Sequence, residues 1–396
     1  MCYRSRQRRD AYTNMQLVII VISSLLFCLY AFLIIYYMLA WRSIPRFNPD
    51  PASSIKYPVS ISVIIPARNE ESSLAKLLYG LNNQSYGKNF YEVIVVDDHS
   101  TDNTAEIARQ FASSNVKLLE LKNYISDDGI NSYKKKAIEV AIAQSKGELI
   151  ITTDADCLVQ EDWLQTIAAF YKQYQPEFIV MPVSYNCRNN FLEIFQALDF
   201  MSLQGITAAS VNSNMLSMCN GANLAYTRKA FESVNGFAGI SNIASGDDML
   251  LMHKIKQRYP QQLGYLFCQG STVTTPPMPD WKSFLNQRIR WASKADKYID
   301  KSIFWVLALV YALNAGMLIL LCWSLFETNG WYNWLILLIA KTIVELGFMI
   351  PVARFYGHSS SLLYFPLMQP FHILYTVVAG WLGKFGSYKW KGRNVH

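Results

Sequence analysis

Four apolar runs divide the chain into segments of different character. Residues 17–40, 303–326 and 331–352 carry few or no charged side chains, and residues 362–382 form a fourth run that contains prolines. A helix of about 20 apolar residues is long enough to cross a bilayer. The first run is too long for a signal peptide and lacks a small-residue cleavage site at its end, so we favour an uncleaved anchor. The pattern predicts transmembrane helices at both ends of the chain.

The residues between these runs follow a different pattern, in which apolar strands alternate with helices. Strands that are apolar on both faces indicate a parallel sheet with helices packed on either side. Such a sheet binds ligands at the carboxyl ends of its strands. We therefore expect an α/β fold with strands at 60–67, 92–98, 116–121 and 149–152 and helices at 72–83, 101–112 and 134–145.

The second half of this middle region is less regular. We expect two further strands at 178–183 and 220–226, and helices at 191–204, 247–257 and 280–300. In the last helix aromatic and basic residues alternate, which is typical of a helix that lies in the membrane interface.

The chain thus divides into segments that the pattern and composition distinguish. We expect a basic tail (1–14), an anchor (15–40), a proline-rich extended linker (41–58), an α/β domain (59–280), an interfacial helix (281–300), a transmembrane hairpin with a tight turn at 327–330 (301–353), a third apolar segment (361–383) and a basic tail (384–396). Because the third segment contains Pro366, Pro370, Gln369 and His372, it is a re-entrant, an interfacial or a spanning helix.

The membrane topology of the first run is ambiguous. Arg4, Arg6, Arg8 and Arg9 precede it, and by the positive-inside rule they place the N-terminus in the cytoplasm and the domain outside. A domain that uses a cytoplasmic donor needs the opposite orientation. Translation from Met15 would remove all four arginines and resolve the conflict; N-terminal sequencing tests this hypothesis.

Composition agrees with a membrane protein that has a soluble middle domain. The 396 residues are 52% hydrophobic and 16% charged, against about 25% charged in a typical soluble domain. The net charge of +7 suits an anionic membrane surface and anionic substrates without being specific. The seven cysteines show no paired spacing, which favours free thiols over disulfides or a zinc site.

Two aspartates, Asp154 and Asp156, follow the buried strand 149–152. Alternation at the end of a strand would make both side chains point the same way, and two converging carboxylates repel unless a cation lies between them. Two oxygen ligands suit Mg²⁺ or Mn²⁺, which completes its coordination with phosphate oxygens and water. A pair of solvated turn acids is the alternative interpretation, because this short pattern also occurs by chance.

Five ordered motifs resemble those of the membrane-bound branch of the family 2 glycosyltransferases, which includes polysaccharide synthases and ceramide-type glucosyltransferases. They are VIIPARNEE at 63–71, VVDDHSTDNT at 95–104, DAD at 154–156, GDDMLL at 246–251 and QRIRW at 287–291. The resemblance covers residues 60–290 and implies a GT-A fold, a nucleotide-diphosphate sugar donor and a divalent metal, Mg²⁺ or Mn²⁺.

The resemblance also implies roles for individual residues at the donor site. Asp156 would bind the metal, and Asp154 the ribose and the metal shell. Asp97 and Asp98 would contact the base or ribose, beside a pocket formed by Pro66, Ala67, Asn69 and Glu70. For the aspartates a turn or helix cap is the alternative, and Glu70 alternatively favours the start of the next helix. Lys134 aligns with a donor-site lysine, although Tyr133 replaces the usual glycine; a solvated basic helix start is the alternative.

For the reaction itself, the resemblance implies Asp248 as the catalytic base and Asp247 as its supporter. Both open a helix, where acids are also favoured as caps. Gln287, Arg288, Arg290 and Trp291 would contact the donor, Trp291 also the acceptor, and Asn220, Gly221 and Asn223 the acceptor. Arginine pairs with diphosphates and tryptophan stacks on sugars, but both residue types also anchor helices at membrane interfaces.

One charged pair, Lys341 and Glu345, lies inside an apolar run at a spacing of four residues. Intramembrane charges often serve function, but here we favour a structural, self-paired role.

These observations predict an inverting, metal-dependent glycosyltransferase with its domain at the cytoplasmic face of the inner membrane. The donor would be a nucleotide sugar, UDP-linked by resemblance, and the acceptor a lipid, a lipid-linked sugar or a growing glycan. We expect membrane lipids but no nucleic acid as partners, and the oligomeric state is left open. A processive polysaccharide synthase is the nearest alternative, distinguished by product length. A non-catalytic binding module would have lost the acids, and a transporter would need more spans.

Overall fold

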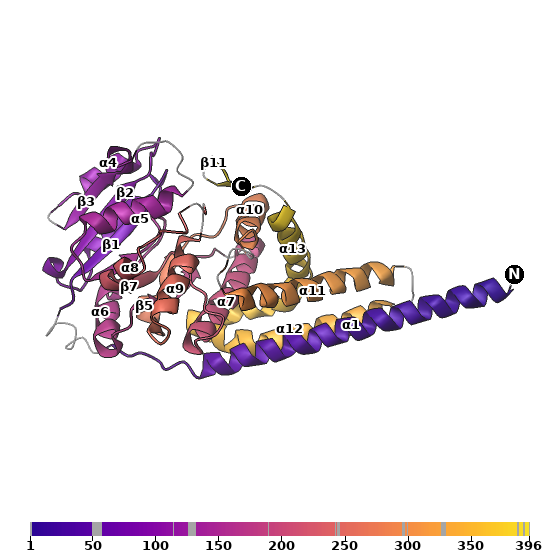
Figure 1. Cartoon of the computed structure of the whole chain (residues 1–396). Helices are drawn as coiled ribbons and strands as arrows, with labels where there is room; N and C mark the ends of the chain where they lie inside the picture. The colour runs from indigo at the N-terminus through magenta and orange to yellow at the C-terminus, as the bar shows by residue number, and fades with distance from the viewer. Residues whose placement is uncertain are drawn as a thin grey trace. The chain divides into compact units, whose positions relative to one another are not determined.

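The computed structural model describes residues 2–49, 58–113, 115–125, 132–188, 190–241, 243, 246–294, 298, 300–325, 330–385, 388–390 and 393–395, without the side chains of residues 2–16 and 386–396. The chain forms two compact units. The first comprises Met1–Leu39 and Pro279–Tyr388, and the second comprises Ala40–Met278 and Lys389–His396. The labels in Figure 1 identify the elements of each unit.

The second unit is built on a 7-stranded, mostly parallel sheet with the order β3-β2-β1-β4-β7-β5-β8. The strand β7 is antiparallel to both of its neighbours, β4 and β5, and the other pairs are parallel. The bounds are β1 (Ile61–Ala67), β2 (Tyr91–Asp97), β3 (Val116–Glu120), β4 (Leu149–Thr152), β5 (Phe178–Val180), β7 (Leu224–Thr227) and β8 (Leu263–Tyr265). The predicted α/β architecture is confirmed.

The central strands β1, β2 and β4 are buried on both faces, as their runs of apolar residues predict. Such a sheet is covered by helices on both sides. The helices of this unit are α3 (Leu74–Asn82), η1 (Lys88–Phe90), α4 (Thr104–Gln110), η2 (Leu121–Asn123), α5 (Tyr133–Gln144), α6 (Trp163–Tyr174), α7 (Phe191–Asn212), α8 (Arg228–Ser233), α9 (Asp247–Arg258) and η3 (Gln269–Ser271). Most predicted helices agree within about two residues, but α7 continues eight residues beyond the predicted end at residue 204.

The predicted strand 178–183 is in fact two strands in different sheets. After β5 the chain turns at Met181 and Pro182, and Val183–Tyr185 forms β6, which pairs with β9 (Val273–Thr275). Pro182 has no backbone N–H for a sheet, and its carbonyl accepts from Val273 N at 3.1 Å. The predicted strand 220–226 also begins later, at Leu224, because Asn220 opens a turn in which its carbonyl accepts from Asn223 N.

The described part of the predicted linker, up to residue 49, is packed rather than extended. Trp41, Ile44 and Phe47 are buried, and Phe47 meets the Phe170 ring edge-on at 5.2 Å. Phe47 N also donates to the carbonyl of Phe267 at 3.1 Å. This segment therefore belongs to the core of the second unit; the rest of the predicted linker, 50–57, lies outside the described residues.

The first unit consists of long apolar helices. They are α1 (Cys2–Arg42), which continues into the second unit, α11 (Lys301–Ser324), α12 (Gly330–Tyr356) and α13 (Phe365–Phe385), together with α10 (Trp281–Ala292) and η4 (Ser359–Tyr364). The helical segments Leu17–Arg42, Lys301–Ser324, Gly330–Tyr356 and Ser359–Phe385 are long and apolar enough to cross a membrane. The predicted helix 280–300 is shorter, ending at Ala292, and the turn predicted at 327–330 lies outside the described residues except for Gly330. Near the C-terminus, β10 (Tyr388–Trp390) pairs with β11 (Arg393–Val395).

A buried polar network joins three helices of this first unit. Lys341 Nζ of α12 lies 2.6 Å from Glu345 Oε1 and donates to Gln369 Oε1 of α13 at 2.7 Å. Gln369 Nε2 donates to Glu345 Oε2 at 2.5 Å, and the hydroxyl of Tyr30 in α1 donates to Glu345 Oε1. The charges of Lys341 and Glu345 are thus paired with each other and hydrogen-bonded, as a buried ion pair requires.

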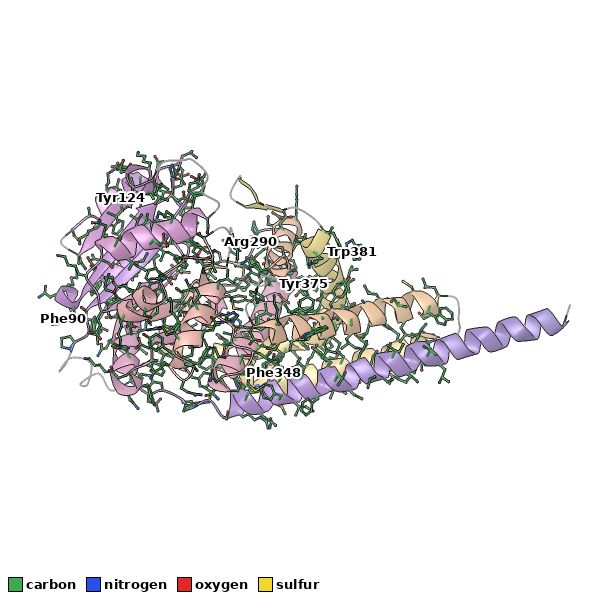
Figure 2. All side chains as sticks on the ribbon, viewed as in Figure 1. Phe90, Tyr124, Arg290, Phe348, Tyr375 and Trp381 are labelled. Carbon is green, nitrogen blue, oxygen red and sulfur yellow. The ribbon has the colours of Figure 1, made fainter. Side chains whose placement is uncertain are left out.

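The helix α10 packs along α13 through aromatic contacts. Phe284 meets the Tyr375 ring edge-on at 5.2 Å, and Trp281 stacks on Phe371 at 6.3 Å. A Cβ added to Gly383 would lie 2.8 Å from the Cβ of Ala292, so only glycine fits at this crossing. Figure 2 labels Arg290 on α10 and Tyr375 and Trp381 on α13.

Candidate active site

Three lysines begin the helix α5, and the structure gives each a different environment. Lys136 is half-exposed and pairs with Glu139 at 3.3 Å. Lys135 is 2% exposed and donates to the carbonyls of Ile240 and Ile243. Lys134 lies beside the acidic residues that the sequence singled out. The alternative of a solvated basic helix start therefore describes Lys136 alone.

The ammonium of Lys134 bridges two carboxylates from different elements. It donates to Asp154 Oδ1, after β4, at 2.7 Å, and lies 3.4 Å from Asp247 Oδ2, in the first turn of α9. Burial alone would lower the pKa of Lys134, but the charges of Asp154 and then Asp247 outweigh burial and raise it well above its usual value. The sheet edge and the start of α9 therefore meet at one site.

Asp248 is held by backbone amides on two sides. Its Oδ2 accepts from Gly221 N at 3.0 Å, and its Oδ1 accepts from Met249 N at 2.8 Å. Gly246, at the N-cap of α9, has φ +79°, a conformation that favours glycine. A carboxylate has about four lone-pair positions, so these two bonds leave room for a hydroxyl donor. The arrangement fixes Asp248 without using up its capacity to accept a proton.

Asp154 and Asp156 lie in the turn after β4, which ends at Thr152. Strand alternation therefore does not set their directions, contrary to the sequence argument. Asp156 Oδ1 lies 3.8 Å from the buried thiol of Cys157, and burial, together with the charges of Asp154 and Asp156, raises the pKa of that thiol well above its ordinary value. The two carboxylates therefore lie at one place in the fold.

The donor set at this turn fits a divalent cation in part. Carboxylate oxygens are the ligands that Mg²⁺ and Mn²⁺ prefer, and two of them leave positions for phosphate and water. Over the part of the chain that the structure describes, no group of three or more His, Cys, Asp or Glu side chains is placed to hold a metal by itself. Asp154 and Asp156 would therefore hold such an ion with water, or more tightly with ligands from a bound substrate.

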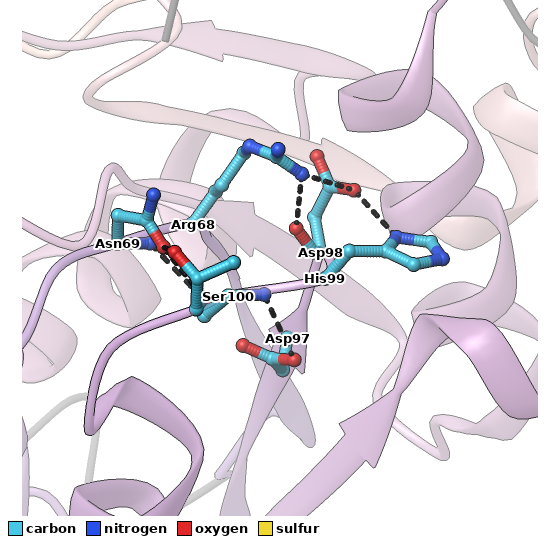
Figure 3. Close-up of polar contacts among 7 residues, drawn as sticks. Arg68, Asn69, Asp97, Asp98, His99 and Ser100 are labelled. Atoms are coloured by element: carbon cyan, nitrogen blue, oxygen red, sulfur yellow. Dashed lines mark hydrogen bonds and ion pairs between the residues drawn. The ribbon is translucent and has the colours of Figure 1, made fainter. Parts of the chain in front are cut away.

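Asp97 and Asp98 end the strand β2 and point to opposite sides (Figure 3). Asp98 is paired with the guanidinium of Arg68 at 3.7 Å and with His99 Nδ1 at 3.0 Å. Asp97 is 5% exposed; its Oδ2 accepts from Ser100 N at 3.4 Å, and its buried Oδ1 has no hydrogen-bond partner within the described residues. An unsatisfied buried carboxylate oxygen is costly, so Asp97 is the better placed of the two to accept from a ligand.

The predicted base pocket lies at the ends of β1 and β2. Ala67 ends β1, directly after Pro66, and its carbonyl accepts from Asp98 N at 2.8 Å. Asn69, with φ +53°, bridges to the next loop by accepting from Thr101 N at 2.9 Å. The carboxylate of Glu70 accepts from Ser73 Oγ at 2.8 Å, just before α3, as the helix-start interpretation expects. The four residues lie together at this edge of the sheet.

The predicted acceptor residues have different environments. Asn220 Oδ1 accepts from Ala222 N and shapes the turn, and Gly221 contacts Asp248. Asn223, however, is fully buried: its amide donates to the carbonyls of Pro182 and Ser271 and accepts from the indole of Trp163. We withdraw Asn223 from the predicted acceptor contacts, because it ties interior segments together and is closed to a ligand.

The motif QRIRW lies on α10, in the first unit. Arg288 is 4% exposed; its guanidinium lies 4.6 Å from the Phe284 ring centre and 4.3 Å from that of Trp291, and it donates to Gln287 Oε1 at 2.6 Å. This aromatic enclosure stabilises the buried charge, and we withdraw Arg288 from the predicted donor contacts. Gln287, Arg290 and Trp291 are partly exposed, and their donor contacts remain predictions.

Two residues near the acids were not predicted. Lys135 bonds the carbonyls of Ile240 and Ile243, which precede the acidic pair, and burial lowers its pKa. The Tyr226 hydroxyl is buried without a hydrogen-bond partner in the described chain; burial, and then the charge of Asp247, raise its pKa. The first residue is one of three adjacent lysines and the second lies in an apolar strand, so neither had a distinguishing sequence signal.

Comparison with known families identifies the chain's class. The model described as Glycosyl transferase family 2 matches residues 62–234, and Glycosyl transferase family group 2 matches residues 149–382, more than half of the chain. The chain belongs to the family 2 glycosyltransferases.

Curated relatives share parts of this chain. It is 28% identical over 255 residues to the beta-monoglucosyldiacylglycerol synthase of a Nostoc species, a match of 63% of this chain and 51% of the relative. It is 39% identical over 107 residues to the glycosyltransferase AglE of Haloferax volcanii, a match of 26% of this chain and 33% of the relative. The matches thus span between about a third and a half of these two proteins.

One solved structure shows the fold. The mannosyltransferase PcManGT from Pyrobaculum calidifontis, in complex with GDP-Man and Mn²⁺, superposes with a TM-score of 0.52 at 19% identity. The superposition covers 91% of this chain and 99% of that chain. The second unit therefore has a GT-A-like α/β fold.

Proposed function

We propose that the protein transfers a sugar from a nucleotide-diphosphate donor to a lipid, lipid-linked or glycan acceptor at the cytoplasmic face of the inner membrane. The observation that carries this proposal is the meeting of Asp154, Lys134, Asp247 and Asp248 beside Gly221. It brings a basic group, a candidate cation site and a fixed carboxylate to the carboxyl edge of a GT-A-like sheet, where such folds bind ligands.

In this proposal Asp248 accepts the proton of the acceptor hydroxyl as that oxygen attacks the anomeric carbon. Its two amide contacts fix the carboxylate in position before the acceptor arrives. One displacement with one base and no covalent intermediate inverts the anomeric centre. Asp247 keeps Lys134 beside this base through their 3.4 Å contact.

Two groups of residues at the carboxyl edge of the sheet would bind the two parts of the donor, its nucleoside and its diphosphate. Asp97, with its unsatisfied Oδ1, accepts a hydrogen bond from the base or ribose beside Pro66, Ala67, Asn69 and Glu70. Asp154 and Asp156 would hold Mg²⁺ or Mn²⁺, which supplies Lewis-acid stabilisation of the leaving diphosphate. Gln287, Arg290 and Trp291 are proposed as further contacts, and the preference for UDP follows the family resemblance.

A lipid-type acceptor is supported by two independent features. The chain has four helices apolar enough to cross a membrane, and its longest match among the relatives reported above is with a beta-monoglucosyldiacylglycerol synthase. In the scheme that we propose, Asn220, Gly221 and Trp291 form the acceptor side.

We propose that α1, α11 and α12 span the membrane and that η4 with α13 forms a re-entrant segment. Gln369, near the start of α13, is bonded to Lys341 in the middle of α12. Gly383, near the end of α13, packs on Ala292, which precedes α11. The helix α13 therefore starts near the middle of the membrane and ends beside the residues before α11, on the side where α11 enters the membrane. It returns to the membrane face from which it came. Both the domain and the basic tail are then cytoplasmic.

A fusion test decides this topology. A C-terminal fluorescent protein that folds only in the cytoplasm is expected to be bright, and a C-terminal alkaline phosphatase inactive. The reverse result would mean that α13 spans the membrane.

The activity test uses membranes that contain the full chain and a panel of radiolabelled nucleotide sugars with Mn²⁺. Transfer to an extractable lipid or glycan from one donor, lost in Asp156→Ala, is the expected result. Full transfer by Asp156→Ala would contradict the proposed metal site, and no turnover of any donor would contradict the proposed activity.

A further inference from the structure

The ammonium of Lys134 is bound to Asp154, a carboxylate that a divalent cation at the proposed metal site would also use. It lies 2.7 Å from Asp154 Oδ1, within direct hydrogen-bond distance. A metal ion on the other oxygen of this carboxylate would lie beside the ammonium, and the repulsion between the two positive charges would weaken metal binding. The same ammonium lies only 3.4 Å from Asp247 Oδ2, so a second carboxylate is already within reach.

The surrounding charge favours an additional cation. Asp154, Asp156, Asp247 and Asp248 contribute four negative charges. Lys134 and Lys135, which both interact with Asp247 and Asp248, contribute two positive charges, which leaves a net of two negative charges. Removing Lys134 would leave Asp154 without its bonded counter-ion, and a metal ion would then bind without displacing anything.

The ammonium of Lys134, which lies near Asp247, also lies near Asp248, the proposed base. A Cβ placed on Gly221 would lie 3.5 Å from Lys134 Nζ and 3.4 Å from Asp248 Oδ2, so both atoms border the same small volume. A shift of the ammonium from Asp154 towards Asp247 needs no change in the backbone.

We propose that Lys134 is a positioning residue that serves as the counter-ion of Asp154 in the empty site and passes to Asp247 when a divalent cation binds at Asp154 and Asp156. Binding of the cation with its nucleotide thereby moves the positive charge of Lys134 closer to the acidic pair, Asp247 and Asp248. This inference rests on the proposed function and adds to it a link between loading of the donor site and organisation of the base.

The test measures Mn²⁺ binding to the full chain, purified in detergent, from the electron paramagnetic resonance signal of free Mn²⁺. It is done without nucleotide and then with UDP. The variants are Lys134→Met, Asp247→Asn and the matched control Lys136→Met, two residues further along α5 and on its half-exposed side. Thermal unfolding confirms that each variant is folded, and Lys134→Gln replaces Lys134→Met if the latter does not fold.

Without nucleotide, Lys134→Met is expected to bind Mn²⁺ about tenfold more tightly than the wild type, since it removes the competing charge. Lys136→Met is expected to match the wild type. Asp247→Asn is expected to bind Mn²⁺ more weakly, because Lys134 then loses the carboxylate towards which it would move and stays on Asp154. A purely structural role for Lys134 would not increase metal affinity.

Unchanged or weaker Mn²⁺ binding by Lys134→Met, in a protein whose wild type binds Mn²⁺ with UDP, would overturn this inference and leave the proposed function standing. Failure of the wild type to bind Mn²⁺ even with UDP would contradict the proposed metal site itself.

Discussion

The backbone amide of Gly221 donates a hydrogen bond to Oδ2 of Asp248 at 3.0 Å. This contact joins the turn before β7 to the first turn of α9, two segments that are 27 residues apart in the chain. It places the proposed base beside a residue that has no side chain, and so leaves space for an acceptor hydroxyl.

Filling that space is expected to reduce transfer without unfolding the protein. A Cβ at Gly221 would be in ordinary contact with Asp248 and Lys134, at 3.4 and 3.5 Å, so Gly221→Ala fits the fold. We expect it to raise the KM for the acceptor several-fold, and the larger Gly221→Val to lower kcat/KM by about 100-fold, since misplacement of about 1 Å at a reacting centre costs that much. Steady-state kinetics at saturating donor measures both.

The matched control is Gly270→Ala, whose Cβ would also make only ordinary contacts, 3.6 Å from Thr166 Oγ1 and 3.7 Å from Cys268 Sγ. It is expected to keep wild-type kinetics. Wild-type kinetics in Gly221→Val would show that the acceptor does not approach Asp248 past this glycine.

The two adjacent aspartates at the end of β2 are expected to differ in function. Asp97→Asn alters a carboxylate whose Oδ1 is unsatisfied, and should weaken nucleotide binding about tenfold, the loss of one hydrogen bond to a charged group. Asp98→Asn breaks the contacts with Arg68 and His99 and should mainly lower the melting temperature. Calorimetric titration with nucleoside diphosphates and thermal unfolding separate the two effects. Equal losses of nucleotide affinity would show that both carboxylates contact the donor.

The buried network that joins the apolar helices α1, α12 and α13 predicts a specific order of stabilities. Glu345→Gln or Lys341→Met alone leaves an uncompensated buried charge and should destabilise the protein by about 3 to 5 kcal/mol. The double variant Lys341→Met with Glu345→Gln removes both charges and should be less destabilised than either single variant. Unfolding in detergent, followed by tryptophan fluorescence, measures the order. If the loss of unfolding free energy in the double variant equals the sum of the losses in the two single variants, the two charges do not stabilise each other.

The stability of the second unit is expected to depend on pH through Glu92. Burial alone would raise the pKa of this carboxyl, but hydrogen bonds from Lys117, the Lys146 amide and Ser62 outweigh it and lower the pKa below its ordinary value of 4.5. A lowered pKa means that the stabilisation is fully present above pH 4.5 and is lost as the pH falls through the folded-state pKa.

Glu92→Gln should therefore destabilise the protein by about 1 to 2 kcal/mol at pH 7, and by progressively less below pH 4.5. Melting temperatures of the wild type and the variant across this range test the difference. The control Glu106→Gln changes an exposed carboxyl that pairs with Arg109 at 3.1 Å, and should have little effect at any pH. A difference in melting temperature between Glu92→Gln and the wild type that stays the same at every pH would contradict the role of Glu92 ionisation.

Local patterns in the sequence predicted the elements well but not the contacts between them. The apolar run 149–152 and the acids after it are local features, and β4 has those bounds. Pro182 is a local signal for the split, but the pairing of β6 with β9, which puts the residues after it in a different sheet, could not be predicted from the local pattern. Boundaries that depend on a distant partner strand cannot be read from local periodicity.

The candidate site shows the same limit. Asp154, Asp247 and Lys134 were identified from motifs, and the structure brings one oxygen of each carboxylate within 3.4 Å of the Lys134 ammonium. The sequence did not reveal that Asn223 and Arg288 are buried. Asn223 bonds Trp163, 60 residues away in the chain, whereas Arg288 packs against Phe284 and Trp291 of its own helix. Residue type suggests a chemistry, whereas burial decides whether a substrate reaches it.

The proposed reaction depends most on Asp248, and single-turnover transfer by Asp248→Asn examines that dependence. The control is Asp162→Asn, an exposed residue at the N-cap of α6. We expect Asp248→Asn to lose transfer by a factor of about 100 or more while it still binds the nucleotide, since a general base contributes about that much, and Asp162→Asn to match the wild type. Transfer by Asp248→Asn at the wild-type rate would contradict the assignment of Asp248 as the base, and with it the proposed mechanism.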